Sequence, residues 1–182
     1  MRVSQGFSKG FTLIELVVVM VILGLLSAVA VPKFLDLSAD AEAASVKNVL
    51  GSLRSGLSIK VASGLISGTD ISTWKYNGSA ALSPMEDLLA DKPESYIGIR
   101  TSGGAPAENG VWWDRQTRAT DNWVMYSLKK DSIITKPDGS AGGGWNSNGK
   151  NIIHRIEAIT ENGNTVGLTL SPTANYDFTW AK

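Results

Sequence analysis

FTLIELVVVMVILGLLSAVAV, residues 11–31, is the stretch that decides the fold of this 182-residue chain. It contains one charged side chain, Glu15. A helix of that length rises roughly 31 Å, about the thickness of the hydrocarbon core of a bilayer. The ten residues before it are polar and carry Arg2 and Lys9, which predicts that this end stays on the cytoplasmic side of a membrane. The stretch therefore predicts a helix that needs either lipid or other copies of itself around it.

An ordinary secretory signal is the plainest alternative, with Ala28-Val29-Ala30 as a small-x-small cleavage site. The apolar run, however, is longer than the 7–15 residues of a cleaved signal. A carboxylate inside it also costs roughly 2.5–3.5 kcal/mol on insertion scales, and pairing with a cation recovers much of that cost. A polar residue tolerated near the membrane interface is a further interpretation of Glu15.

The junction Gly10-Phe11-Thr12-Leu13-Ile14-Glu15-Leu16 resembles the class III signal of type IV pilins and of type II secretion pseudopilins. In that family a prepilin peptidase cuts after the glycine and methylates the new amine. The resemblance implies a cut between Gly10 and Phe11, methylation of Phe11, and Glu15 as the fifth mature residue. The freed amine would then pair with Glu15, either within one chain or on an adjacent subunit, where the pair would set the register of the packed helices.

A second apolar pattern follows at the spacing of one helix face. Its members are Val46, Val49, Leu50, Leu53 and Leu57. One helix is therefore predicted from Phe11 to about Ala62, with an exposed hydrophobic first half and a second half buried against a sheet. Gly24 and Pro32 are the expected kink points once subunits pack, because proline removes a backbone donor and glycine costs about 1 kcal/mol against alanine.

The remaining residues predict loops and then strands. A short helix is expected over 84–90, with Ser83 as its cap, Pro84 at its first position and Glu86 at its third. Alternating apolar residues predict strands over 123–128, 152–159 and 166–171, with a closing edge strand at 176–180. Glu161-Asn162-Gly163-Asn164 predicts a tight hairpin.

These elements predict an α+β fold in which the long helix packs on a four-stranded antiparallel sheet, in agreement with the roll of the pilin family. The expected organisation is a cleaved leader over 1–10, a transmembrane and filament-core helix over 11–32, and a globular head over 33–182. Within the head, an irregular connecting loop is expected over 65–111 and the sheet over 112–182.

Composition excludes several classes of function. Lys+Arg and Asp+Glu each number 17, so no basic surface for nucleic acid is expected. The absence of cysteine excludes thiol chemistry, and the one histidine, His154, lies mid-strand without a nucleophile motif. We therefore expect no enzymatic activity. The missing cysteines also depart from the disulfide-stapled loop of most type IV pilins, which favours a pseudopilin slightly.

Two features leave alternatives open. The loop PDGSAGGGWNSNGKN, residues 137–151, offers oxygens from Asp138, Asn146 and Asn148 as weak calcium candidates, but a plain surface loop without a cofactor is the better interpretation. Trp112, Trp113 and Trp145 lie in or beside glycine-rich segments. They fit core packing, or else a surface for subunit packing or glycan binding.

The function that the resemblance implies is a structural subunit of a type IV pilus-like filament, a fimbrium. Its partners would be copies of itself, the prepilin peptidase, and an assembly platform with its ATPase. Its location would be the inner membrane as a precursor and then an extracellular filament. The segment 31–65 looks most like pilins of the mannose-sensitive haemagglutinin type. The alternatives are a type II secretion pseudopilin and, from another class, a secreted or membrane-anchored glycan-binding module. Adhesion, motility, DNA uptake and secretion stay open.

Overall fold

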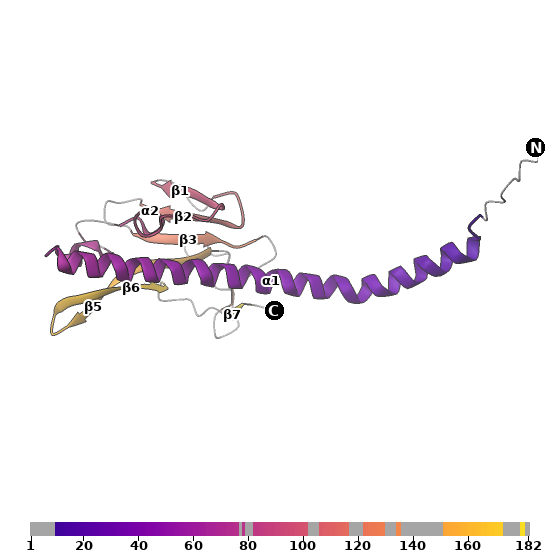
Figure 1. Cartoon of the computed structure of the whole chain (residues 1–182), viewed down its shortest axis with the longest axis horizontal. Helices are drawn as coiled ribbons and strands as arrows, with labels where there is room; N and C mark the ends of the chain where they lie inside the picture. Colours follow the sequence, from indigo (N-terminus) through magenta and orange to yellow (C-terminus); the bar gives the residue numbers. More distant parts are fainter. Residues whose placement is uncertain are drawn as a thin grey trace, which may run out of the picture. The chain divides into compact units, whose positions relative to one another are not determined.

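The structure is a computed structural model, which describes residues 10–76, 78, 82–101, 106–116, 122–129, 134–135, 151–172 and 179–180. The chain divides into two compact units, Met1–Ala41 and Glu42–Lys182. One helix, α1 (Leu13–Ile66), has 54 residues and contributes to both units (Figure 1). The single long helix predicted from the sequence is therefore confirmed. It continues as helix through Gly24 and Pro32, and kinking there in packed subunits stays a prediction.

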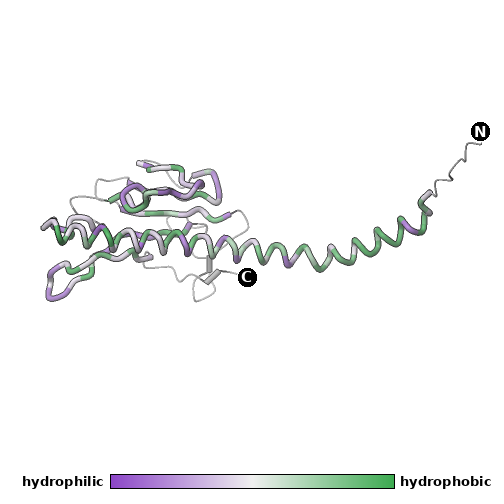
Figure 2. Tube along the Cα trace, viewed as in Figure 1, coloured by the Kyte–Doolittle hydropathy of each residue, from purple (hydrophilic) through white to green (hydrophobic). Residues whose placement is uncertain are grey.

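The described part of the first unit exposes nearly all of its apolar surface. Every large apolar side chain between Phe11 and Leu37 is solvent-exposed, and the tube in Figure 2 is almost continuously hydrophobic over this stretch. Monomeric soluble proteins rarely expose contiguous apolar patches of more than a few hundred Å². We therefore expect lipid or other protein chains to cover this half of α1.

The second unit is built on a five-stranded sheet with the order β1-β2-β3-β5-β6. The strands are β1 (Tyr96–Arg100), β2 (Val111–Arg115), β3 (Trp123–Ser127), β5 (Asn151–Glu161) and β6 (Asn164–Pro172). A separate two-stranded sheet joins β4 (Ile134–Thr135) to β7 (Thr179–Trp180). Two short helices, η1 (Ile71–Trp74) and α2 (Pro84–Leu88), lie in the connection between α1 and the sheet.

Three details of the predicted sheet were wrong. The sheet has five strands rather than four, because neither β1 nor β2 was predicted as a strand. It is mixed rather than antiparallel, because β1 runs parallel to β2. The expected closing strand pairs with β4 instead of joining the main sheet. Strand β1 was missed because Gly98 at its centre interrupts the alternation of side chains that identifies a strand. In the structure Gly98 has a φ of 95° and lies at an irregularity in the pairing with β2.

The second half of α1 packs on one face of the sheet, as the sequence predicts. Val46, Leu50, Leu53 and Leu57 are each at most 4% exposed. They form one core with residues from the sheet and the connection, namely Leu82, Met85, Trp112, Val124, Tyr126, Leu128, Ile152, Ile156, Leu168 and Leu170. Burying such a side chain fully contributes about 1.5–3 kcal/mol, so this stripe fixes the helix to the sheet.

A buried carboxylate also anchors α1 where the second unit begins. Glu42 is 4% exposed and accepts hydrogen bonds from the Tyr126 hydroxyl at 3.0 Å and the Lys129 backbone N–H at 2.8 Å. A buried charge is tolerated only when it is paired in this way. The sequence pattern did not reveal this contact, because it joins residues more than 80 positions apart.

The opposite face of the sheet carries a second apolar cluster, formed by Trp113, Trp123, Met125 and Ile153. Arginine side chains lie against its rings. The Arg115 guanidinium is 5.4 Å from the ring centroid of Trp123, and that of Arg100 is 5.9 Å from Trp113. Such cation–π contacts contribute about 0.5–2 kcal/mol each.

The tryptophans of the sheet are core residues. Trp112 and Trp113 are each 2% exposed and point to opposite faces of β2, one into each cluster. The core-packing interpretation therefore holds for these two side chains, and neither can serve as an exposed platform for glycan. Trp145 lies outside the described residues.

The hairpin predicted between β5 and β6 is confirmed. Asn162 and Gly163 have φ values of 49° and 81°, the left-handed conformation that a two-residue turn of this kind requires. The turn fixes the register in which Ile156 faces Leu170 and Ala158 faces Leu168, so the apolar side chains of both strands share one face.

The cap of α2 differs from the prediction. Ser83 is at the N-cap position and Pro84 occupies the first turn, as expected, but the Ser83 hydroxyl makes no capping hydrogen bond. The Ser83 backbone N–H, however, donates to the carboxylate of Asp87 at 2.7 Å instead of to Glu86. Glu86 instead forms an ion pair with Lys92 at 2.9 Å. The pairing with Lys92 draws Glu86 away from the capping position.

Two glycines of α1 make a matched test of how α2 packs. A Cβ at Gly56 would collide with the Leu88 backbone carbonyl, whereas a Cβ at Gly51 would meet nothing within 4 Å. We expect Gly56→Ala to lower the free energy of unfolding by about 1–3 kcal/mol through overpacking. Gly51→Ala should raise it by about 0.5–1 kcal/mol, because alanine is the better helix former.

Urea unfolding of the detergent-solubilised full chain, followed by tryptophan fluorescence, would measure both changes. Stabilisation by both substitutions would contradict the close approach of α1 and α2.

Candidate functional site

The amino-terminal junction precedes the first turn of α1. Phe11 is 85% exposed, and a Cβ at Gly10 would meet nothing within 4 Å. Helix α1 starts only at Leu13, so the Gly10–Phe11 bond lies in non-helical backbone. The bond is thus exposed and lies outside the helix, as proteolytic sites commonly do.

Thr12 and Glu15 cap α1 reciprocally. The Glu15 Oε2 atom accepts hydrogen bonds from the Thr12 backbone N–H and the Thr12 hydroxyl, both at 2.8 Å. The Glu15 N–H in turn donates to the Thr12 hydroxyl oxygen at 3.3 Å. This arrangement is a capping box, which satisfies backbone donors at the start of a helix. The role was missed in the sequence, although the spacing Thr-x-x-Glu is its usual signature.

Apolar side chains surround the Glu15 carboxylate. Phe11, Ile14, Val18 and Val19 line an open groove together with Glu15. Between Gly10 and Val31 no other side chain is charged. In a chain cut after Gly10, a cation near this carboxylate would come from the new terminal amine or from another molecule. The groove and its charge fit an apolar segment that carries one positive group.

Helix α1 is long and apolar enough to cross a membrane, the one such helix among the described residues. Its apolar window has a mean hydropathy of 2.8, and no part of that window is buried within the chain. A core helix of a soluble domain would be mostly covered by its own protein. The exposed helix thus has the composition of a segment that enters lipid or a helical bundle.

Comparison with known proteins decides the family. Residues 1–31 match the family model described as the prokaryotic N-terminal methylation motif. The chain is 34% identical over 143 residues to a fimbrial protein of Moraxella nonliquefaciens, a match that covers 74% of this chain and 80% of that protein. The chain belongs to the type IV pilin family.

Two further pilins match mainly the amino-terminal part. The type IV narrow pilus major component PilA5 of Thermus thermophilus is 50% identical over 52 residues, 29% of this chain and 45% of that protein. The type IV major fimbrial protein FimA of Dichelobacter nodosus is 33% identical over 70 residues, 38% of this chain and 45% of that protein. The chain thus spans less than half the length of these two relatives. No solved structure matches it. The resemblance to the mannose-sensitive haemagglutinin type stays a prediction.

The other candidate residues of this pilin do not form a second site. Asp138, Asn146 and Asn148 lie outside the described residues, so the calcium interpretation stays a prediction. Among the residues that the structure describes, no three histidine or acidic side chains gather to hold a metal ion. His154 is fully buried in β5, where burial, with a smaller contribution from Arg54, lowers its pKa to about 3. A histidine in that position stays neutral and out of reach of a substrate.

Proposed function

We propose that this chain is a structural subunit of a type IV pilus-like filament, cut between Gly10 and Phe11 and assembled through the first half of α1. One observation carries the proposal. The first half of α1 exposes an uninterrupted apolar surface, and a single carboxylate, Glu15, lies at its start. Such a surface is unstable in water and becomes buried when several copies pack side by side.

Glu15 gives the packed helices a register. Cleavage after Gly10 would create an amine at Phe11, one residue before the capping box. In an apolar bundle an unpaired carboxylate costs several kcal/mol, and an unpaired amine does too. Pairing the Glu15 carboxylate with the Phe11 amine of an adjacent subunit removes both costs, whereas an axial slip restores them. Both hydrogen bonds that Thr12 donates to the Glu15 carboxylate are accepted by Oε2. Within the described residues, Oε1 accepts no hydrogen bond.

The family membership suggests the partners and the route. A prepilin peptidase would cut and methylate the chain, and an assembly platform with its ATPase would extract it from the inner membrane. The finished filament would lie outside the cell, with the second unit at its surface. The chain would act by packing and not by catalysis. A pseudopilin of a secretion system is the alternative, and it would differ in staying with the cell envelope.

Electron microscopy of a sheared extracellular fraction tests the proposal. Wild-type cells should yield filaments labelled by antibody against the second unit. A deletion strain should yield none, and the plasmid-borne gene should restore them. Labelled protein confined to the envelope would favour the pseudopilin alternative. A soluble secreted protein without filaments would contradict both interpretations.

A further inference from the structure

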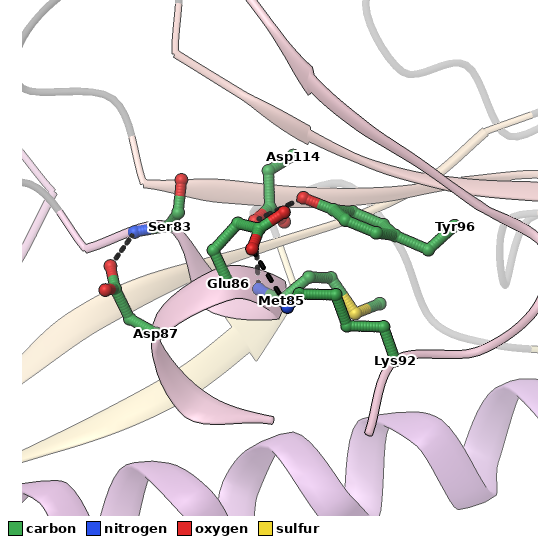
Figure 3. Close-up of polar contacts among 7 residues, drawn as sticks. All are labelled: Ser83, Met85, Glu86, Asp87, Lys92, Tyr96 and Asp114. Atoms are coloured by element: carbon green, nitrogen blue, oxygen red, sulfur yellow. Dashed lines mark hydrogen bonds and ion pairs between the residues drawn. The ribbon is translucent and has the colours of Figure 1, made fainter. Parts of the chain in front are cut away.

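A buried carboxyl group joins three segments of the second unit. Asp114 of β2 is fully buried and accepts a hydrogen bond from the Met85 backbone N–H of α2 at 2.9 Å. The hydroxyl of Tyr96, at the start of β1, lies 3.4 Å from the same oxygen (Figure 3). The contacts of Asp114 thus fasten both ends of the stretch Leu82–Tyr96, here called the α2–β1 segment.

The hydrogen bonds around Asp114 do not satisfy an ionised carboxylate. Its Oδ1 atom has no hydrogen-bond partner among the described residues. The Tyr96 hydroxyl has one proton but contacts two carboxylates, those of Asp114 and Glu86. Glu86 is already neutralised by Lys92 at 2.9 Å. An ionised Asp114 would therefore be a buried negative charge beside a second carboxylate, without an ion pair among the described residues.

The remaining described neighbours bring no positive charge into contact with Asp114. Opposite Asp114 on β3 lies Val124, and His154 follows on β5 in the same row across the sheet. Arg54 of α1 acts electrostatically on His154. On α2 the carboxylate of Asp87 is engaged by the Ser83 N–H. Among the described residues, the charged and titratable groups around Asp114 are thus Glu86, Tyr96 and Lys92, and the neutral His154 lies on the second strand from Asp114.

Burial raises the pKa of Asp114 to about 7, although the N–H groups of Met85 and Glu86 and the Tyr96 hydroxyl act in the opposite direction. The carboxyl is therefore mostly protonated in mild acid while it stays buried. A proton removes the charge and leaves the hydrogen bond from Met85 in place. The closed arrangement and the proton thus stabilise each other.

We propose that Asp114 is a proton-operated latch, which holds the α2–β1 segment on the sheet when its carboxyl is protonated and loosens the segment when it ionises. The segment is acidic and exposed at Glu86, Asp87, Asp91 and Glu94. Opening would carry these side chains away from the sheet and uncover Leu82 and Met85, while the α1 stripe from Val46 to Leu57 stays packed on the sheet. The latch is a property of the second unit and does not depend on whether the chain forms filaments.

The linkage fixes the direction of the effect. When the segment opens, Asp114 reaches water and returns to an ordinary carboxyl pKa, well below its value in the closed form. The opening constant should then rise about tenfold for each pH unit between about 5 and 6.5 and level off above about 7. Tight closure is expected at low pH.

Hydrogen exchange of the full-length chain in detergent, read by mass spectrometry on peptides containing the Met85 and Glu86 amides, tests the latch. Rates are divided by the intrinsic exchange rate at each pH. We expect the opening constant of these amides to rise as described, while amides of β5 change less than threefold. An equal slope in β5 would mean global unfolding and would overturn the proposal, as would a flat profile at Met85.

Two variants separate the carboxyl from its surroundings. Asp114→Asn keeps an acceptor for the Met85 N–H but cannot ionise, so its opening constant should not depend on pH. Asp87→Asn alters a neighbouring carboxylate that accepts a hydrogen bond from the Ser83 N–H, and it should keep the wild-type slope. If Asp114→Asn fails to fold, the wild-type protein still tests the proposal, through the pH slope of the opening constant at Met85 compared with that of the β5 amides. A pH slope that persists in Asp114→Asn would overturn the proposal.

Discussion

Glu15→Ala is expected to abolish filaments, with a loss of more than tenfold in sheared protein, while the chain still inserts into the membrane. The substitution removes the one charge in the apolar part of α1, so insertion becomes easier rather than harder. It also removes the proposed partner of the Phe11 amine, which would then be buried unpaired in each packed subunit at a cost of several kcal/mol. Quantitative immunoblotting of the membrane and sheared fractions would measure both effects.

Thr12→Val separates the two roles of Glu15. This substitution removes the threonine hydroxyl of the capping box and keeps the carboxylate. Loss of a cap costs about 1 kcal/mol, which a long helix tolerates, so filaments should persist. Asp40→Ala, at an exposed acidic position later in α1, should also leave assembly intact. Loss of filaments in Thr12→Val equal to that in Glu15→Ala would mean that capping, and not pairing with an amine, is the essential role of Glu15.

The second large effect is an opposed pH dependence of stability in two variants. Between about pH 4.5 and 6, buried Asp114 stays protonated in the folded state and ionises in the unfolded state, so its contribution to stability falls as the pH rises. His154 is neutral when folded and protonated when unfolded, so its contribution rises with pH over the same range. The two trends offset each other. The wild-type free energy of unfolding should therefore change by less than about 1 kcal/mol there.

Each variant should reveal the pH dependence that comes from the group that remains. In Asp114→Asn the free energy of unfolding should rise by about 1.4 kcal/mol for each pH unit, and in His154→Leu it should fall by a similar amount. His154 is the one histidine of the chain, so an untagged protein gives an unambiguous result. Urea unfolding in detergent at several pH values would measure the slopes. Parallel profiles in both variants would contradict the burial of these two groups.

How far the sequence predicts this molecule depends on how local each signal is. The apolar run at residues 11–31, the stripe from Val46 to Leu57 and the Asn162-Gly163 turn are local patterns, and the structure confirms all three elements. Strand β1 was missed because five residues with a glycine in the centre give little alternation, and β2 was missed because Val-Trp-Trp-Asp-Arg does not alternate either. The second sheet joins segments far apart in the chain, and no local pattern shows that pairing.

The functional residues also differ in whether a local sequence pattern predicts them. Gly10, Phe11 and Glu15 follow from a short motif with fixed spacing. The capping box at Thr12 could also have been predicted, since its signature is only four residues long. Glu42 and Asp114 could not, because each is buried by partners from distant segments, and their charge in the sequence suggests an exposed surface position. Buried acids of this kind become visible only when the fold brings those partners together.

Intact-mass and amino-terminal analysis of the subunit in sheared filaments tests the central claim most directly. We expect sedimentable fibres whose subunit begins at Phe11 and carries one methyl group on its amine. That result would place the apolar half of α1, with Glu15 near its start, inside the mature protein. A subunit beginning at Val31 and found only in soluble form would contradict the account, because the surface proposed to drive assembly would then be missing.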